Sequence, residues 1–178
     1  MIYTSETTER NAIIQVAELM TAAARTAPKA CGIDVIETMI VDGDDKNRLT
    51  ASMREIGTAK GKAFFLRDAG NVDDSPLIVL IASAITPRGL NCGLCGTENC
   101  ALAETGGIPC TMAVNDLGIA GGSAAAVAMD NRIDNRMLFS AGMAALELKL
   151  FSDKVKLCFG IPLSVSGKNI FFDRKATV

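Results

Sequence analysis

The sequence contains no histidine and no tryptophan, and only 4% of its 178 residues are aromatic. Without histidine, the chain cannot form His-ligated zinc or haem sites, Ser-His or Cys-His nucleophile pairs, or an imidazole general base. Hydrolase chemistry of that kind is therefore not expected. The hydrophobic residues, 49% of the chain, are mostly Ala, Val, Ile, Leu and Met. Such side chains suit helices that pack closely against a sheet.

Long runs of basic or apolar residues are also missing. The net charge is -2, and Lys and Arg do not cluster, so the backbone of a nucleic acid is not an expected partner. Residues 1–10 are polar and acidic, unlike a signal peptide. The longest apolar stretches, 76–85 and 117–129, fall short of the ~20 residues of a membrane span. These features predict a cytoplasmic protein that does not enter a membrane.

The length of the chain predicts a single domain, residues 1–178, and its hydrophobic pattern predicts an α+β fold. The run 77–85 is apolar at every position but one, which predicts a central strand covered on both faces. The other expected elements alternate around it, giving a mixed sheet flanked by helices. Predicted helices cover 6–26, 46–60, 111–129 and 134–150, with a short one near 99–104, and further predicted strands cover 35–41, 63–66, 155–161 and 169–172.

Four of the six cysteines lie within nineteen residues. Cys92, Cys95, Cys100 and Cys110 have the spacing C-x2-C-x4-C-x9-C, inside a glycine-rich loop predicted over 86–111. In a reducing compartment, clustered cysteines favour a metal centre over disulfides. A four-iron cluster takes four thiolate ligands, and adjacent glycines let backbone N–H groups approach its sulfides. The motif therefore predicts a 4Fe-4S cluster held by these four residues.

Both the metal of this site and its function have an alternative. Structural zinc sites usually combine two C-x2-C knuckles, and this chain has one, so zinc ranks below iron–sulfur. The favoured function is electron transfer, in an oxidoreductase or with a partner. The alternative is a non-enzymatic binding module whose four-cysteine site, iron–sulfur or zinc, is structural. A role in iron–sulfur sensing ranks last, because no nucleic-acid-binding motif accompanies it.

The remaining cysteines have different surroundings. Cys158 lies in an apolar strand, which predicts a buried and inert thiol. Cys31 follows the predicted first helix and is either an ordinary loop thiol or a residue near a cofactor. Arg25 and Lys29 flank the end of the same helix. They would either neutralise a phosphate or complement the negative helix C-terminus, and the second reading is favoured.

The chain also resembles known families. The segment 92–110 resembles the four-iron segment of corrinoid iron–sulfur proteins and some electron-transport subunits. The segments 22–32 and 158–162 are similar to parts of the nitroreductase-like flavoprotein fold. Together with 116–120 and 160–174, they identify the chain as resembling a prokaryotic family of ferredoxin-domain-containing proteins of unknown function.

This resemblance implies a nitroreductase-like fold, a homodimer and FMN as a cofactor. Nitroreductases place an Arg-rich segment before the first helix to bind the flavin phosphate, whereas residues 1–9 here contain no Arg or Lys. Arg10, Arg25 and Lys29 are the cations that would substitute, and Cys31 lies beside them in sequence. The electron acceptor would be a redox partner or a small molecule.

Overall fold

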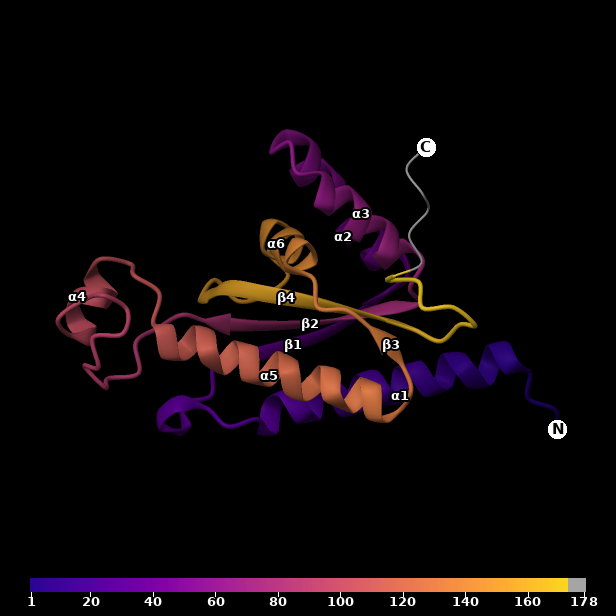
Figure 1. The fold of residues 1–178 in the computed structure, drawn as a ribbon, viewed down its shortest axis with the longest axis horizontal. Coiled ribbons are helices and arrows are strands. Elements are labelled where there is room, and N and C mark those ends of the chain that lie inside the picture. The colour runs from indigo at the N-terminus through magenta and orange to yellow at the C-terminus, as the bar shows by residue number, and fades with distance from the viewer. Residues whose placement is uncertain (173–178) are drawn as a thin grey trace.

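The computed structural model describes residues 1–172, and its middle layer is a four-stranded antiparallel sheet with the strand order β1-β2-β4-β3 (Figure 1). β2 is central, as predicted, because it pairs with β1 on one side and β4 on the other. All its residues are buried. The strands are β1 (Ile36–Asp42), β2 (Leu77–Ala84), β3 (Asp134–Asn135) and β4 (Val155–Ser164).

Helices cover both faces of this sheet, which confirms the α+β fold (Figure 1). One face packs against α1 (Ser5–Thr26) and α5 (Thr111–Asp130), and the other against α2 (Gly43–Ala59), α3 (Ala63–Asp73) and α6 (Phe139–Glu147). Two short elements, η1 (Ala30–Gly32) and α4 (Cys100–Thr105), lie in the connections.

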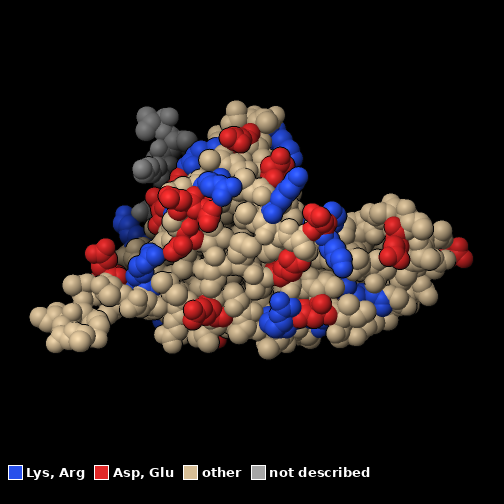
Figure 2. Space-filling model, turned by 180° about the vertical axis from the view of Figure 1, so that it is seen from behind, with Lys and Arg blue, Asp and Glu red and all other residues tan. Residues whose placement is uncertain are grey.

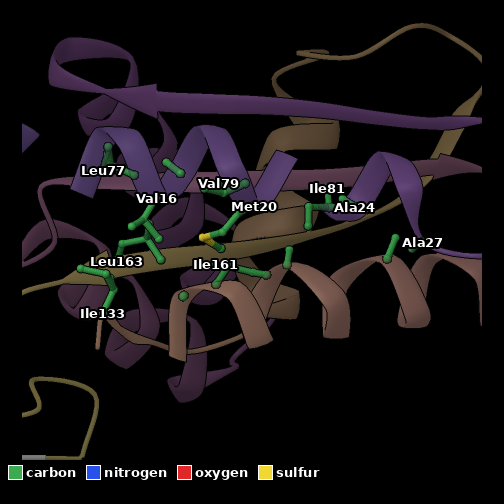
Figure 3. Close-up of a cluster of buried hydrophobic side chains, with 14 of the residues drawn as sticks. Val16, Met20, Ala24, Ala27, Leu77, Val79, Ile81, Ile133, Ile161 and Leu163 are labelled. Carbon is green, nitrogen blue, oxygen red and sulfur yellow. The ribbon is translucent and has the colours of Figure 1, made fainter. Parts of the chain in front are cut away.

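Alternating residues of β2 supply both hydrophobic cores. Leu77, Val79 and Ile81 face α1 and α5, whereas Ile78, Leu80 and Ala82 face the other layer. This division follows from the strand geometry, in which successive side chains point to opposite faces. Figure 3 shows the first core, where side chains of α1 meet those of the sheet and α5. Each large apolar side chain buried there contributes roughly 1.5–3 kcal/mol.

Helix α5 is the most apolar long helix of the fold. By length and composition alone, it is the one helix in the described part of the chain that could span a membrane. The helix begins at Thr111, ahead of the apolar run 117–129, so it is longer than that run. Helix α5 lies along α1 (Figure 1), and its buried alanines belong to the first core, as in core helices of globular proteins. Small side chains allow the two helices to approach closely.

Three predicted elements were wrong. Residues 63–66 begin helix α3 and do not form a strand, because Phe65, Ala69 and Val72 are buried together at helical spacing. Helix α6 begins at Phe139, since residues 134–135 pair with β4 as β3. Residues 170–172 form a turn and not a closing strand, and Asp173 and Arg174 lie outside the described residues.

Candidate metal centre

The cysteine-rich loop connects the end of β2 to the start of α5. It projects with α4 from one end of the molecule, beyond the ends of both elements (Figure 1). The backbone N–H of Cys110 donates to the carbonyl of Ile85 at 3.0 Å, which brings the two ends of the loop together. The loop is therefore anchored at its base, while its cysteines lie away from the two hydrophobic cores.

All four cysteines of the motif line one pocket. The pocket is narrow, with about 10 Å³ of space that a water molecule could occupy. No disulfide joins them. As the side chains are placed, no three His, Cys, Asp or Glu side chains of residues 1–172 converge on one metal position. A four-iron cluster binds each thiolate through a different iron, so its four ligands do not have to meet at a single metal position.

The backbone of the loop has the conformations that such a site needs. Gly93 and Gly96 have positive φ angles of 72° and 82°, which glycine adopts without a steric penalty. No atom beyond their chain neighbours lies closer than 3.8 Å to where their Cβ atoms would stand. The N–H of Gly96 donates to the carbonyl of Gly93 at 2.9 Å, which closes a turn between Cys92 and Thr97. Four cysteine thiols are a donor set that suits an iron–sulfur cluster.

Hydrogen bonds to sulfur already organise two of the thiols. The backbone N–H of Asn91 donates to Sγ of Cys100 at 3.3 Å, and the N–H of Cys100 donates to the Asn91 side chain at 2.8 Å. The hydroxyl of Thr97 lies 3.1 Å from Sγ of Cys95. That contact lowers the pKa of the Cys95 thiol. Because the thiolate is the metal ligand, this environment favours the binding form.

Cys110 differs from the other three cysteines of the motif because it is buried and lies at the N-cap of α5. Its side chain makes no capping hydrogen bond. Cys110 therefore stands at the N-terminal end of α5, where a helix carries a partial positive charge.

Sequence reasoning missed an ion pair beside this pocket. Arg88 lies in the pocket wall, and its guanidinium binds the carboxylate of Asp116 in α5. Both side chains are buried, with 1% and 2% of their surface exposed. The sequence did show Asp116 as an acidic residue within the apolar stretch that follows Cys110. Its partner Arg88 lies 28 positions away, so the sequence did not indicate the pair.

The residues predicted to bind a flavin phosphate are already engaged at a helix end. The ammonium of Lys29 donates to the carbonyls of Ala24, Arg25 and Ala27 at 3.1, 2.5 and 2.7 Å. Arg25 pairs with Asp34 at 2.6 Å. These contacts fit the helix-terminus interpretation. With these partners, the two cations do not fit a flavin phosphate.

The other predicted positions near that helix end are exposed. Cys31 is an exposed thiol with a positive φ of 57°, in the short helix η1. Arg10 pairs with Asp42 at 3.0 Å, near the other end of α1. The structure therefore does not bring Arg10 together with Arg25 and Lys29.

Cys158 is buried in β4, as predicted. Only 1% of its surface is exposed, and burial raises the pKa of its thiol from 9.0 to about 12. A neutral thiol is a poor nucleophile and a poor metal ligand. Cys158 is therefore a packing residue, which separates it from the four cysteines of the pocket.

We expect the free energy of unfolding to decrease above pH 9. Part of this decrease comes from Cys158 and should be absent in Cys158→Ala. The unfolded thiol ionises above its ordinary pKa of 9.0, whereas the folded thiol stays protonated up to about 12. The folded state then binds more protons, so this contribution is complete below pH 9 and is lost as the pH rises. The loss is about 1.4 kcal/mol at about pH 10. Urea unfolding at several alkaline pH values measures it, and an equal pH slope in both proteins would contradict it.

Solved structures of known proteins share this fold. The FMN-dependent nitroreductase from Clostridium difficile R20291 is 18% identical, with a TM-score of 0.56, over 86% of this chain and 76% of its own. B. megaterium NfrA2 is 12% identical, with a TM-score of 0.57, over 87% of this chain. The chain spans only 58% of the length of NfrA2. Such similarity shows the fold, which is nitroreductase-like, as predicted.

The fold defines the general class, a protein with a nitroreductase-like domain. A family model described as "Uncharacterized protein containing a ferredoxin domain" (DUF2148) matches residues 106–174. An uncharacterized protein of Archaeoglobus fulgidus is 38% identical over 175 residues, covering 93% of this chain and 94% of that protein. The chain belongs to this ferredoxin-domain family, which confirms the resemblance seen in the sequence. The matched residues include Cys110 but not the other three cysteines of the pocket.

Proposed function

We propose that this protein binds a 4Fe-4S cluster through Cys92, Cys95, Cys100 and Cys110 and uses it for electron transfer. The proposal rests on one observation, that the four cysteines of the motif line a single pocket. A bound cluster of this type takes up and releases single electrons. The protein residues supply the thiolate ligands, the hydrogen bonds to sulfur and the partial shielding from water.

Three of the four proposed ligands have a distinct support in the loop. The contact between Asn91 and Cys100 fixes the third ligand against the start of the motif. Thr97 favours the thiolate of Cys95, and Cys110 is held at the N-cap of α5. Hydrogen bonds to sulfur and burial are among the terms that set the potential of such a cluster.

The surroundings of the pocket support a role in transfer to another molecule. Leu90, Leu94, Leu102 and Ile108 are exposed around it. Figure 2 shows the same end of the molecule, at the right, with few charged side chains. We propose that a redox partner or a small-molecule acceptor approaches here, in the cytoplasm.

We also propose that the protein forms a homodimer. Apolar side chains of α5, including Val114, Ile119 and Met129, are exposed on its outer face. A second copy that covers this face would remove them from water. Sedimentation equilibrium would then give twice the chain mass.

Anaerobic purification tests the main proposal. Iron, acid-labile sulfide, zinc and flavin are measured on one sample of the full chain. We expect iron and sulfide in equal amounts, near four of each per chain for one such cluster, with a visible absorbance that dithionite bleaches. A colourless protein with one zinc per chain would contradict the proposal and favour a structural site instead. Stoichiometric flavin in the same sample would support the FMN prediction.

A further inference from the structure

The buried ion pair of Arg88 and Asp116 joins three segments of the fold. Nε and Nη2 of Arg88 each donate to Oδ2 of Asp116 at 3.2 Å, and Nη1 donates to the carbonyl of Thr86 at 3.3 Å. The other carboxylate oxygen, Oδ1, accepts the backbone N–H of Ala30 at 3.0 Å. The pair therefore ties the start of the cysteine loop to α5 and to the turn that follows α1.

The two charges lie at different depths relative to the cysteines. Arg88 lines the same pocket as the four thiols, whereas Asp116 is not part of the pocket wall. The cation is thus on the cysteine side of the pair and the carboxylate stands behind it. Both are shielded from water, so their fields are screened less than those of surface charges.

Packing alone does not account well for this arrangement. Two charges removed from water lose much of their hydration energy, and a buried ion pair is often no more stabilising than apolar side chains of the same size. A fixed positive charge beside a cluster has a separate effect, because it stabilises the form that carries one more electron. Net charge near a cluster is among the factors that set its potential.

We propose that Arg88 and Asp116 form a positioning pair that sets the reduction potential of the centre bound by the four cysteines. This inference rests on the proposed function. The guanidinium raises the potential, and the carboxylate both holds Arg88 in the pocket wall and offsets part of its charge. Loss of the cation and loss of the anion therefore shift the potential in opposite directions.

The test compares midpoint potentials of the purified holoprotein and its variants in an anaerobic dye-mediated titration. Arg88→Met should lower the potential, and Asp116→Asn should raise it. Each shift should change the ratio of reduced to oxidised centre about tenfold at a fixed applied potential, or about 59 mV for one electron. Arg88→Lys keeps the charge and should restore most of the difference. Thermal unfolding of the apoproteins is measured in parallel.

Lys46→Met is the matched control. Lys46 is also a buried cation, but it donates to the carbonyls of Val72, Asp73 and Ser75 on the opposite side of the sheet. Its loss should lower the melting temperature and leave the potential unchanged. If Arg88→Met does not fold, the midpoint potentials of Asp116→Asn and Arg88→Lys still test the proposal. The first should be higher than that of the wild type, and the second should be close to it.

The outcomes separate this inference from the proposed function. A wild-type protein without iron would overturn the proposed function, and the inference with it. A wild-type protein with its iron, but with potentials in Arg88→Met and Asp116→Asn that are equal to wild type, would overturn the inference alone. Shifts of both variants in the same direction would mean that the pair acts only on the structure of the loop, and would overturn it as well.

Discussion

Replacement of Cys95 by serine is expected to lower the affinity of the site for iron at least ~10-fold, because changes to groups that only support metal ligands already cost ~10–100-fold in affinity. Serine offers a hydroxyl where the site needs a thiolate. Cys95 also has a thiol that ionises readily, since the Thr97 hydroxyl lowers its pKa. Iron and sulfide assays after anaerobic reconstitution measure the effect.

Cys31→Ser is the matched control for this experiment. Cys31 is an exposed thiol outside the pocket, so its replacement should leave the bound iron unchanged. The apoprotein of Cys95→Ser should unfold at the same temperature as the wild-type apoprotein, because the side chain lies in the loop and not in either core. Full iron in Cys95→Ser, or an equal loss in Cys31→Ser, would show that the pocket is not the site.

A second large effect is expected at Gly142, in helix α6. A Cβ atom there would stand 1.7 Å from the carbonyl oxygen of Cys158 and 2.3 Å from its carbon. Both atoms belong to the backbone of β4, so a side chain cannot simply rotate away. Gly142→Ala should therefore force α6 off the sheet and lower the free energy of unfolding by about 3 kcal/mol. Urea unfolding of the apoprotein measures the change.

Gly118→Ala in α5 is the control for that substitution. Gly118 is also helical, but nothing lies within 4 Å of its Cβ position. Alanine should stabilise the helix there by roughly 0.5–1 kcal/mol, since it loses less backbone entropy than glycine. The two Gly→Ala changes should thus have opposite signs. Equal unfolding midpoints for Gly142→Ala and the wild type would contradict the close approach of α6 to β4.

Much of the fold was visible in the sequence because its signals are local. The helical spacing of Ile13, Val16 and Met20 predicted α1, and the apolar run of β2 predicted a central strand covered on both faces. The failures were also local in origin. The run 63–66 is too short for its periodicity to separate helix from strand, and only its packing against the second core decides for a helix.

The candidate site was predicted unevenly for the same reason. The four cysteines lie close together along the chain, so their spacing alone indicated a metal centre. The sequence allowed two roles for Arg25 and Lys29, binding a phosphate or complementing the helix C-terminus. Which role holds depends on the acceptors that lie near their side chains. The structure supplies those acceptors in the carbonyls at the end of α1 and in Asp34.

The sequence by itself determined the cysteine motif, the two-sided core strand and most helix positions, because each depends on neighbours along the chain. Only the tertiary structure decided that Arg88 meets Asp116 and that Asp116 meets the backbone of Ala30, 86 positions away. Such contacts depend on how the sheet and helices stack. No local pattern of residues encodes which distant groups a folded chain brings together.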